Sequence, residues 1–269
     1  MKDLNGKTAV ITGGATGIGF GLAKRLGNLG ARVIIAEPRE EKLESSVAEL
    51  ASQGIDAKYF VCDVRELSKV EALADFAWDA NGQVDLLFNN AGVSGGNKPI
   101  IDSSLDDLRA VFDVNFFGVW NGCKVFGRRF VDQGTQAGIY NTGSENSLFN
   151  AVPNIAAYQA TKHAVHALTD ALREQMPEFV GVGLIIPGFV ASDMTKGMAD
   201  LAMDADSFAE KVIEQVQAGQ FYIVSHAYNM VHIDQRHEEI KQAYGQYAPR
   251  HDGDDAQDVR SIIRRMSEK

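Results

Sequence analysis

The sequence predicts an α/β protein built around a parallel β-sheet. Short apolar runs rich in β-branched residues alternate along the chain with longer segments whose apolar residues recur at helical spacing. A glycine-rich turn follows the first of these runs, and a polar residue follows each of the next three. This alternation is typical of a sheet that is covered by helices on both faces and binds ligands at the carboxyl ends of its strands.

The composition indicates a soluble globular chain that forms one large domain. Of its 269 residues, 45% are hydrophobic and 23% are charged, which supplies enough apolar material for a full core. A net charge of −10 argues against nucleic acid or an anionic membrane as a partner. The first seven residues hold no apolar stretch, and no run reaches the roughly 18–20 residues of a membrane span. With two cysteines, Cys62 and Cys123, and no cysteine–histidine cluster, we expect a cytoplasmic protein without a metal site.

The first strand and the turn after it are typical of a nucleotide-binding unit. Residues Thr8–Thr12 predict a strand buried on both faces. Gly13, Gly17 and Gly19 follow, and a helical pattern of apolar residues begins at Leu22. Such glycines allow a tight turn, the approach of backbone N–H groups to a phosphate, and close contact between helix and strand. A plain strand-to-helix turn could use the same residues, so the assignment depends on the rest of the chain.

The second strand ends in an acidic residue at the place expected for ribose recognition. Residues 31–36 predict another buried strand, and Glu37 follows it, about 20 residues beyond the glycines. A carboxylate there accepts hydrogen bonds from the adenosine ribose and repels a 2′-phosphate, which favours NAD over NADP. Arg39 keeps NADP open as the alternative, because a guanidinium could hold that phosphate.

The next elements continue the alternation. They are a helix over residues 40–52, a strand over 57–62, a helix over 66–80 and a strand over 84–88. Asp63 directly follows the strand over 57–62, and Asn90 lies two residues beyond the strand over 84–88. Because the carboxyl ends of parallel strands meet at one edge of a sheet, we expect Gly13, Glu37, Asp63 and Asn90 to line one cofactor cleft.

A long helical pattern then leads to a fifth strand. Residues 104–130 carry apolar residues at helical spacing, interrupted by Asn115. Burying an unsatisfied amide costs roughly 1–3 kcal/mol, so Asn115 either serves a site or kinks or caps the helix within the core. The strand expected at about residues 138–141 places Ser144 just beyond another strand end.

Tyr158 and Lys162 lie one helical turn apart, on the same face of the helix that their apolar neighbours predict. A cation within roughly 4–6 Å of a phenol lowers its pKa from about 10, so this pair could transfer protons. An isolated Tyr-x-x-x-Lys also occurs as an ordinary surface pair on an amphipathic helix, and only the other motifs decide between the two interpretations.

Taken in chain order, these residues resemble the short-chain dehydrogenase/reductase family over roughly residues 7–195. The motifs that carry the resemblance are Thr12-Gly13-x-x-x-Gly17-Ile18-Gly19, Asp63, Asn89-Asn90-Ala91-Gly92, Asn115, Ser144, Tyr158-x-x-x-Lys162 and Pro187-Gly188. Together and in this order they are far more specific than any one of them.

The resemblance implies a single Rossmann-like, doubly wound parallel sheet of about seven strands and a hydride transfer between a nicotinamide and a carbinol or carbonyl carbon. It implies that Tyr158 is the general acid or base, that Lys162 lowers the pKa of Tyr158 and holds the nicotinamide ribose, and that Ser144 hydrogen-bonds the substrate oxygen. Asn115 would anchor a water that relays protons from Lys162. The residues implied to bind the cofactor are Gly13, Thr16, Gly17, Ile18, Gly19, Glu37, Asp63, Val64, Asn90, Ala91, Gly92, Tyr158, Lys162, Pro187, Gly188, Val190 and Ser192.

Two features depart from the family pattern. Ser144 lies 14 positions before Tyr158, one more than is usual, which predicts a longer intervening loop and leaves Ser147 as a weaker candidate for the serine role. Ser192 stands where a threonine is common, which keeps a hydroxyl and loses a methyl group. Neither change removes a group that the chemistry needs.

The region after Pro187-Gly188 is less informative. Methionines among residues 194–208 would suit an irregular apolar ligand, although ordinary packing uses the same residues. A helix over 209–218 and a last strand over 221–224 are expected. We assign residues 1–225 to the catalytic domain and 226–269 to a helical extension of it.

The extension replaces the usual glycine-rich end of the family. Two helices are expected, one carrying Met230, Ile233, Ile240 and Tyr244, the other Val259, Ile262, Ile263 and Met266. They could pack on their own subunit, contact a partner subunit or cover the site. The extension weakly resembles that of family members acting on aryl-alkyl secondary alcohols, and its histidines lack a metal-ligand spacing.

The sequence as a whole predicts an NAD-dependent oxidoreductase that interconverts a secondary alcohol and a ketone, with an apolar or aromatic substrate. The expected assembly is a homodimer or homotetramer. An NADP-dependent carbonyl reductase and a non-catalytic dinucleotide-binding scaffold are the alternatives.

Overall fold

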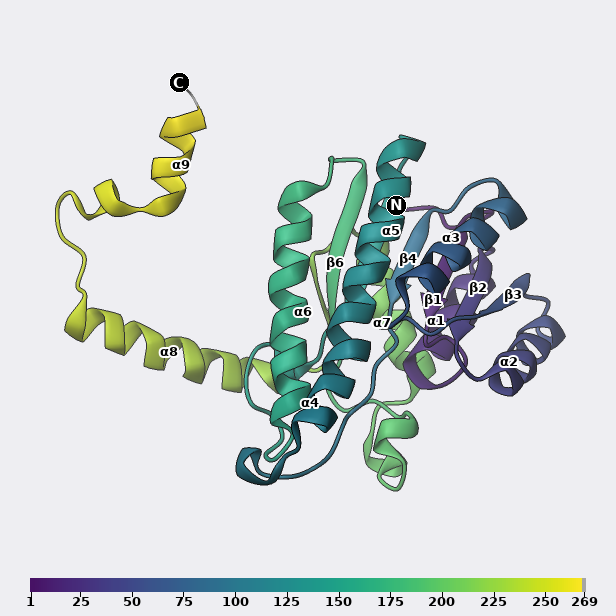
Figure 1. The fold of residues 1–269 in the computed structure, drawn as a ribbon, viewed down its shortest axis with the longest axis horizontal. Coiled ribbons are helices and arrows are strands. Elements are labelled where there is room, and N and C mark those ends of the chain that lie inside the picture. Colours follow the sequence, from purple (N-terminus) through teal and green to yellow (C-terminus); the bar gives the residue numbers. More distant parts are fainter. Residues whose placement is uncertain (268–269) are drawn as a thin grey trace. The chain divides into compact units, whose positions relative to one another are not determined.

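The computed structural model describes residues 1–267, which form one sheet of seven parallel strands (Figure 1). The strands are β1 (Thr8–Thr12), β2 (Arg32–Glu37), β3 (Ala57–Val61), β4 (Leu86–Asn89), β5 (Ala137–Thr142), β6 (Val180–Ile186) and β7 (Tyr222–Val224). Their order in the sheet is β3-β2-β1-β4-β5-β6-β7, and every neighbouring pair is parallel. The predicted Rossmann-like, doubly wound sheet is therefore confirmed.

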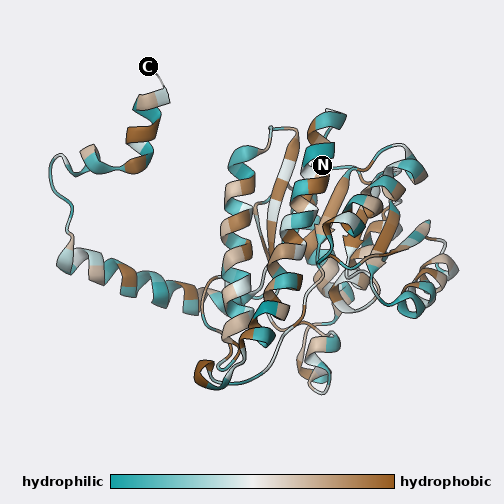
Figure 2. Cartoon of the chain, in the orientation of Figure 1, coloured by the Kyte–Doolittle hydropathy of each residue, from teal (hydrophilic) through white to brown (hydrophobic). Residues whose placement is uncertain are grey.

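Helices cover both faces of this sheet, because each presents one apolar stripe to it. The helices of this layer arrangement are α1 (Gly17–Asn28), α2 (Glu40–Ser52), α3 (Leu67–Asn81), α4 (Leu105–Phe112), α5 (Gly118–Gln133), α6 (Ala156–Gln175) and α7 (Ala205–Gln217). Side chains of α1, α2 and α7 share one buried core with the sheet, and those of α3, α5 and α6 share the other. Figure 2 shows the strands as mainly hydrophobic and the outer helix faces as mainly hydrophilic.

Strand β6 was not predicted from the sequence. Gly181 and Gly183 interrupt its apolar run, and glycine is depleted in strands. The structure explains Gly183 through Tyr140 on the neighbouring β5, whereas a side chain at Gly181 would make only ordinary contacts. A Cβ on Gly183 would lie 2.8 Å from Tyr140 Cδ1, so the strand needs glycine where the ring crosses it.

The expected long helix over residues 104–130 is divided in two. Between α4 and α5 the chain forms a five-residue π-helical turn, Asp113–Phe117, with Asn115 fully buried in it. Single π-helical turns within α-helices are frequent at functional sites, because they re-aim a side chain without ending the helix. The break that Asn115 makes in the apolar pattern therefore marks a real change of backbone geometry.

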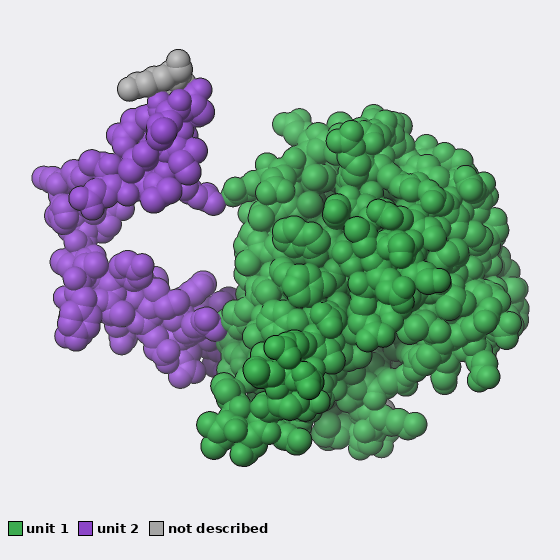
Figure 3. All heavy atoms as spheres, in the orientation of Figure 1, with its two compact units in different colours: residues 1–226 green, residues 227–269 purple. Residues whose placement is uncertain are grey.

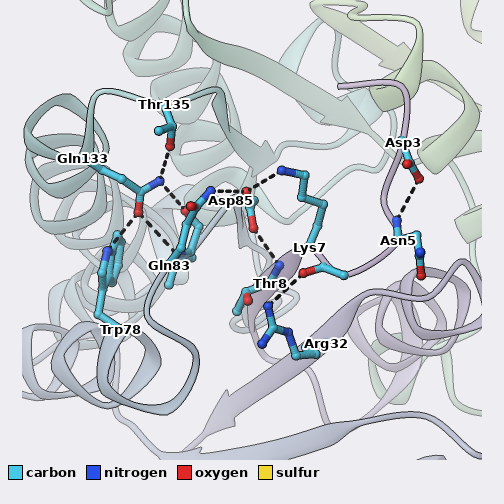
Figure 4. Close-up of polar contacts among 12 residues, drawn as sticks. Asp3, Asn5, Lys7, Thr8, Arg32, Trp78, Gln83, Asp85, Gln133 and Thr135 are labelled. Atoms are coloured by element: carbon cyan, nitrogen blue, oxygen red, sulfur yellow. Dashed lines mark hydrogen bonds and ion pairs between the residues drawn. The ribbon is translucent and has the colours of Figure 1, made fainter.

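A polar network holds the amino-terminal ends of the strands, on the side of the sheet opposite the strand ends that carry the predicted site. Asp85 is 2% exposed and accepts hydrogen bonds from the backbone N–H of Thr8 at 2.8 Å, from Gln83 Nε2 at 2.7 Å and from Lys7 Nζ at 3.2 Å. Figure 4 shows this carboxylate between the segments that lead into β1 and β4. A buried carboxylate with three donors stabilises the fold without taking part in the site.

The chain divides into two compact units, residues 1–226 and a second that begins at Ala227 (Figure 3). The second contains α8 (Asn229–Tyr247) and α9 (Val259–Ser267), close to where the two helices of the extension were expected. Most of its large apolar side chains are exposed, among them Ile240, Tyr244 and Ile263. No helix in residues 1–267 is both long and apolar enough for a membrane span.

Candidate active site

A cleft of about 680 Å³ lies at the carboxyl ends of the strands. The chain builds β2 and β3 outward from β1 and then returns to place β4 on the other side of β1, which opens a crevice at this switch point. Of the predicted site residues, Gly19 and Asn115 do not line the cleft. Those that do are Gly13, Thr16, Gly17, Ile18, Glu37, Asp63, Val64, Asn90, Ala91, Gly92, Ser144, Tyr158, Lys162, Pro187, Gly188, Val190 and Ser192.

The glycine turn is held so closely that side chains cannot replace its hydrogens. Gly13 and Gly17 have φ angles of 63° and 53°, a region that favours glycine. A Cβ on Gly19 would lie 2.1 Å from the carbonyl oxygen of Gly13, which explains this glycine although it does not face the cleft. The turn leads directly into α1, whose first N–H groups have no partner within the helix and can hold a phosphate.

Glu37 ends β2 inside the cleft and is already paired with Arg39. The carboxylate is 4% exposed, and Arg39 binds it in a fork, with Nε donating to Oε1 at 2.7 Å and Nη2 donating to Oε2 at 3.0 Å. Arg39 Nη1 also lies 3.6 Å from a carboxylate oxygen of Asp193, which in turn accepts a hydrogen bond from Thr16. These carboxylates raise the pKa of Arg39 above its usual value.

Asp63 and Asn90 occupy the ends of β3 and β4. Arg65 forms a two-fold ion pair with Asp63 and holds the pKa of that carboxyl below its usual range. The Asn90 amide donates to the carbonyl oxygens of Thr12 and Gly13 and accepts from the Thr142 hydroxyl. Asn90 thereby ties β4 to the glycine turn and to β5, so it positions the cleft wall through the backbone.

Asn115 supports the cleft from behind. Its Oδ1 accepts from the backbone N–H of Val93 at 2.8 Å, and its Nδ2 donates to the Val93 carbonyl at 2.9 Å and to Thr161 Oγ1 at 3.2 Å. All the polar groups of this buried amide are therefore engaged. A Cβ on Gly92 would meet both Asn115 Oδ1, at 3.3 Å, and Lys162 Nζ, at 3.7 Å, so these two side chains flank the same point of the backbone.

Tyr158 and Lys162 lie in the first two turns of α6. Lys162 is 3% exposed, its Nζ donates to the carbonyl oxygen of Thr142 at 2.8 Å, and burial lowers its pKa to about 8. The same nitrogen lies 5.5 Å from the centre of the Tyr158 ring. The structure thus brings the two side chains of the Tyr-x-x-x-Lys motif together inside the cleft.

The expectation that Lys162 lowers the pKa of Tyr158 is not met in this structure. Burial raises the pKa of Tyr158 above its ordinary value, because the cleft removes water from the phenolate. A hydrogen bond with Ser144 acts in the opposite direction, and the Glu145 carboxylate adds to the rise. Desolvation of the phenol oxygen is the largest of these effects.

Ser144 follows β5 and reaches Tyr158 by a hydrogen bond between their side chains. It is 6% exposed, and its hydroxyl oxygen accepts from the backbone N–H of Asn146 at 3.2 Å and from Asn146 Nδ2 at 3.4 Å. Ser147 plays another part, since its hydroxyl accepts from the backbone N–H of Ser144 at 3.1 Å. Ser147 is also absent from the cleft lining.

The segment after β6 closes the far side of the cleft. Ser192 packs against the glycine turn, so that a Cβ on Gly17 would lie 2.9 Å from Ser192 Cβ. Its backbone N–H donates to Thr195 Oγ1 at 2.9 Å. The backbone N–H of Gly188 donates to the ring of His226 at 3.3 Å.

Among the residues of this site that were not identified from the sequence are Asn146, Asp193 and Arg65. Asp193 meets Thr16 across 177 positions, and nothing in the sequence relates the two. Asn146 is two positions from the predicted serine, which was the available signal, but its spacing does not distinguish it from Asn150. Within residues 1–267 no three His, Cys, Asp or Glu side chains gather closely enough to hold a metal ion.

The fold and this cleft define an α/β protein of the Rossmann type with a site suited to an extended nucleotide. A sequence profile described as short chain dehydrogenase matches residues 7–201. The chain therefore belongs to the short-chain dehydrogenase/reductase family and is an oxidoreductase of that family.

Individual relatives agree with this assignment. The chain is 35% identical over 233 residues to 1-deoxy-11-beta-hydroxypentalenate dehydrogenase of Streptomyces avermitilis, covering 83% of this chain and 86% of the relative. A short-chain dehydrogenase/reductase from Burkholderia phymatum, solved in complex with NAD, aligns with a TM-score of 0.85 and 31% identity over 93% of this chain and 99% of that one. A short-chain dehydrogenase from Novosphingobium aromaticivorans aligns with a TM-score of 0.87 and 31% identity over 99% and 97%.

Proposed function

We propose that this protein is an NAD-dependent dehydrogenase that interconverts a secondary alcohol and a ketone. The observation that carries the proposal is the meeting of Ser144, Tyr158 and Lys162 at one end of a cleft whose other end holds Glu37. A hydroxyl, a phenol and a buried cation are the groups that a carbonyl oxygen needs when it gains or loses a proton.

The dimensions and donors of the cleft fit a dinucleotide. The glycine turn leads into α1, whose first N–H groups have no partner within the helix, and a diphosphate would be held there. A bound nicotinamide would accept or supply the hydride. The protein's own part is to orient the substrate oxygen between Ser144 and Tyr158 and to exchange its proton.

Because the pKa of Tyr158 is raised, we expect ketone reduction and alcohol oxidation to depend on pH in different ways. Near neutrality the phenol is protonated, so Tyr158 is ready to donate a proton to a ketone oxygen. Oxidation of an alcohol needs the phenolate as a base and should therefore become faster as the pH rises. Lys162, whose pKa is about 8, supplies a positive charge below that value that favours the phenolate.

The preference for NAD follows from the buried carboxylate of Glu37. A 2′-phosphate at this end of the cleft would approach a carboxylate that is 4% exposed. Arg39 is the group that could attract the phosphate, and its guanidinium is already bound by Glu37 and adjacent to Asp193. NADP binding would have to break this fork-like pair, which is among the stronger polar contacts in proteins.

An apolar substrate is favoured by the surroundings of the reacting groups. Val93, Val114 and Met194 line the cleft together with Ser144 and Tyr158. Flexible methionine side chains adapt to irregular apolar surfaces. The name of the Streptomyces relative, a dehydrogenase of 1-deoxy-11-beta-hydroxypentalenate, is consistent with an alcohol on a hydrocarbon skeleton.

The test is titration of the purified protein with NADH and, separately, NADPH, followed by NAD-linked oxidation of a panel of aryl and alkyl secondary alcohols. We expect tighter binding of NADH and turnover of an apolar alcohol. Tighter binding of NADPH would favour a carbonyl reductase, and binding of neither would contradict the proposal.

Tyr158→Phe tests the catalytic assignment within the same experiment. It should abolish turnover while leaving the NADH dissociation constant within about tenfold, because it removes a proton and little binding surface. Thr169→Val, which removes a fully buried hydroxyl from the same helix, is the matched control and should stay active. Turnover close to wild type in Tyr158→Phe would contradict the assignment.

A further inference from the structure

Asn146 is a buried amide whose orientation is settled by its neighbours. It is 4% exposed and lies two residues after Ser144, at the start of the loop that leads to α6. Its Oδ1 accepts from the backbone N–H of Ala151 at 3.1 Å. A backbone N–H can only donate, so the oxygen of the amide must face Ala151 and the nitrogen must face Ser144.

This orientation leaves the Ser144 hydroxyl with one free direction. A serine hydroxyl has two acceptor sites and one proton. Asn146 fills both acceptor sites, with its backbone N–H at 3.2 Å and its Nδ2 at 3.4 Å from Ser144 Oγ. The remaining hydrogen bond of Ser144, the one it makes with Tyr158, is therefore a donation.

We propose that Asn146 is a positioning residue that fixes Ser144 as a hydrogen-bond donor toward the oxygen of Tyr158 or of the substrate. The proposal rests on the proposed function, in which those oxygens exchange a proton. Two hydroxyls side by side can hydrogen-bond in either direction, and in one of them Tyr158 would donate to Ser144. Asn146 removes that arrangement, because it occupies the lone pairs of Ser144.

The direction of this bond matters for catalysis. A donor aimed at the Tyr158 oxygen stabilises the phenolate, and a donor aimed at a substrate oxygen stabilises the negative charge that develops there. The other charged groups that act on Tyr158 are Lys162, on its own helix, and Glu145, on the segment before the loop. Neither is altered by a change of Asn146.

Two variants separate the hydrogen bond from the structure of the loop. Asn146→Asp is nearly isosteric and can still accept from Ala151, but its side chain cannot donate to Ser144, while its backbone N–H still does. Asn146→Ala adds no charge, but it also removes the contact with Ala151. An effect that both variants share is therefore due to the lost donor, and neither the added charge nor the altered loop can explain it alone.

The experiment is the pH dependence of kcat/KM for NAD-linked oxidation of the best alcohol of the panel. kcat/KM should rise with pH as Tyr158 loses its proton, and in both variants we expect the midpoint of this rise to move up by about one pH unit. We also expect kcat at neutral pH to fall about tenfold. One lost hydrogen bond to a charged oxygen would produce changes of this size. The NADH dissociation constant should stay unchanged. The control Thr169→Val breaks the buried bond to Asn141 Nδ2 and should keep the wild-type midpoint.

The outcomes separate this inference from the proposed function. An inactive Tyr158→Phe together with wild-type midpoints in both Asn146 variants would overturn the role of Asn146 alone. A shift in Asn146→Asp but not in Asn146→Ala would overturn it too, because the added charge would then be the cause. An active Tyr158→Phe would overturn the proposed function and this inference with it.

Discussion

Lys162 is held in the protein at a cost to stability. Its ammonium is 3% exposed, its hydrogen-bond acceptor is the neutral carbonyl of Thr142, and burial lowers its pKa to about 8. In the unfolded chain a lysine loses its proton near pH 10.4. The unfolded state therefore binds more protons between about pH 8 and pH 10.4, and stability should rise with pH over that range.

Replacing this lysine should make the protein more stable and inactive. At pH 7 we expect Lys162→Met to raise the free energy of unfolding by on the order of 1–3 kcal/mol, because an apolar side chain does not pay for desolvation. The gain should shrink as the pH rises from about 8 and level off above about 10.4, where the amine is neutral in both states. Urea unfolding at pH 7 and pH 10 measures both values.

A matched control for that experiment is Lys24→Met. Lys24 is partly exposed and pairs with Asp206 on the surface, where an ion pair contributes about 0–1 kcal/mol. It should show no gain at either pH. A Lys162→Met variant that is less stable than wild type at pH 7 would contradict the conclusion that burying this cation lowers stability.

Glu37 and Arg39 form a second pair of interest at the scale of residues, at the end of the cleft where we propose that the adenosine binds. Glu37→Ala should narrow the preference for NADH over NADPH by about tenfold or more, because it removes the repelling carboxylate and frees Arg39 to bind a phosphate. The two dissociation constants, measured by cofactor fluorescence, give the ratio. Glu41→Ala, an exposed neighbour on α2, should leave the ratio unchanged.

A double variant identifies the cause of that change. If the freed guanidinium binds the phosphate, Glu37→Ala combined with Arg39→Ala should lose the gain in NADPH affinity. An unchanged cofactor ratio in Glu37→Ala would show that this carboxylate does not face the ribose.

At the scale of elements, the carboxyl ends of the strands form the cleft, whereas the amino-terminal ends are held by a buried polar network. The carboxyl ends of β1, β2, β3 and β5 carry glycines, carboxylates and a serine that open into the cleft. The amino-terminal ends of β1 and β4 are closed by Asp85 and its donors (Figure 4). The residues that stabilise the sheet are thus separated from those that form the site.

Asp85→Ala should therefore lower stability without changing catalysis. The backbone N–H of Thr8 and the side chain of Gln83 would lose a buried acceptor, which we expect to lower the free energy of unfolding by about 2–4 kcal/mol. Asp75→Ala, which breaks an exposed pair with Arg129, should cost at most about 1 kcal/mol. A change in kcat/KM of the folded Asp85→Ala enzyme would contradict this separation.

At the scale of the whole molecule, the buried cores and the cleft belong to the first unit. Both hydrophobic clusters and every residue that lines the cleft lie within Met1–His226. In the second unit the side chains from Asp234 to Arg250 are all exposed, including Ile240, Tyr244 and Tyr247. We therefore expect the stability of the first unit and its proposed cofactor site to depend on its own residues.

A chain that ends at His226 should keep its fold and its cofactor site. We expect one cooperative unfolding transition and an NADH dissociation constant within about threefold of the full-length value, a difference below about 1 kcal/mol. Circular dichroism and fluorescence titration measure the two properties. Loss of the transition would show that the extension is required for folding of the first unit.

Much of the architecture could be predicted from the sequence, because strands and helices repeat with periods that local residues set. Thr8–Thr12 and Glu40–Ser52 were expected with the boundaries that the structure shows. β6 could not be recognised, since two glycines interrupt its apolar run and the one at Gly183 is explained only by the ring of Tyr140 on another strand. The seven-stranded sheet was expected from the motifs of the family rather than from periodicity.

By itself, the sequence determined the alternation of elements, the glycine turn and the spacing of Tyr158 and Lys162, because each depends on neighbours a few residues away. The tertiary structure alone decided the partners of these residues. Thr16 meets Asp193 across 177 positions, Asn146 fills the lone pairs of Ser144, and burial raises the pKa of Tyr158 despite the nearby lysine. Desolvation and hydrogen-bond direction depend on what surrounds a side chain in space, and no local pattern contains that information.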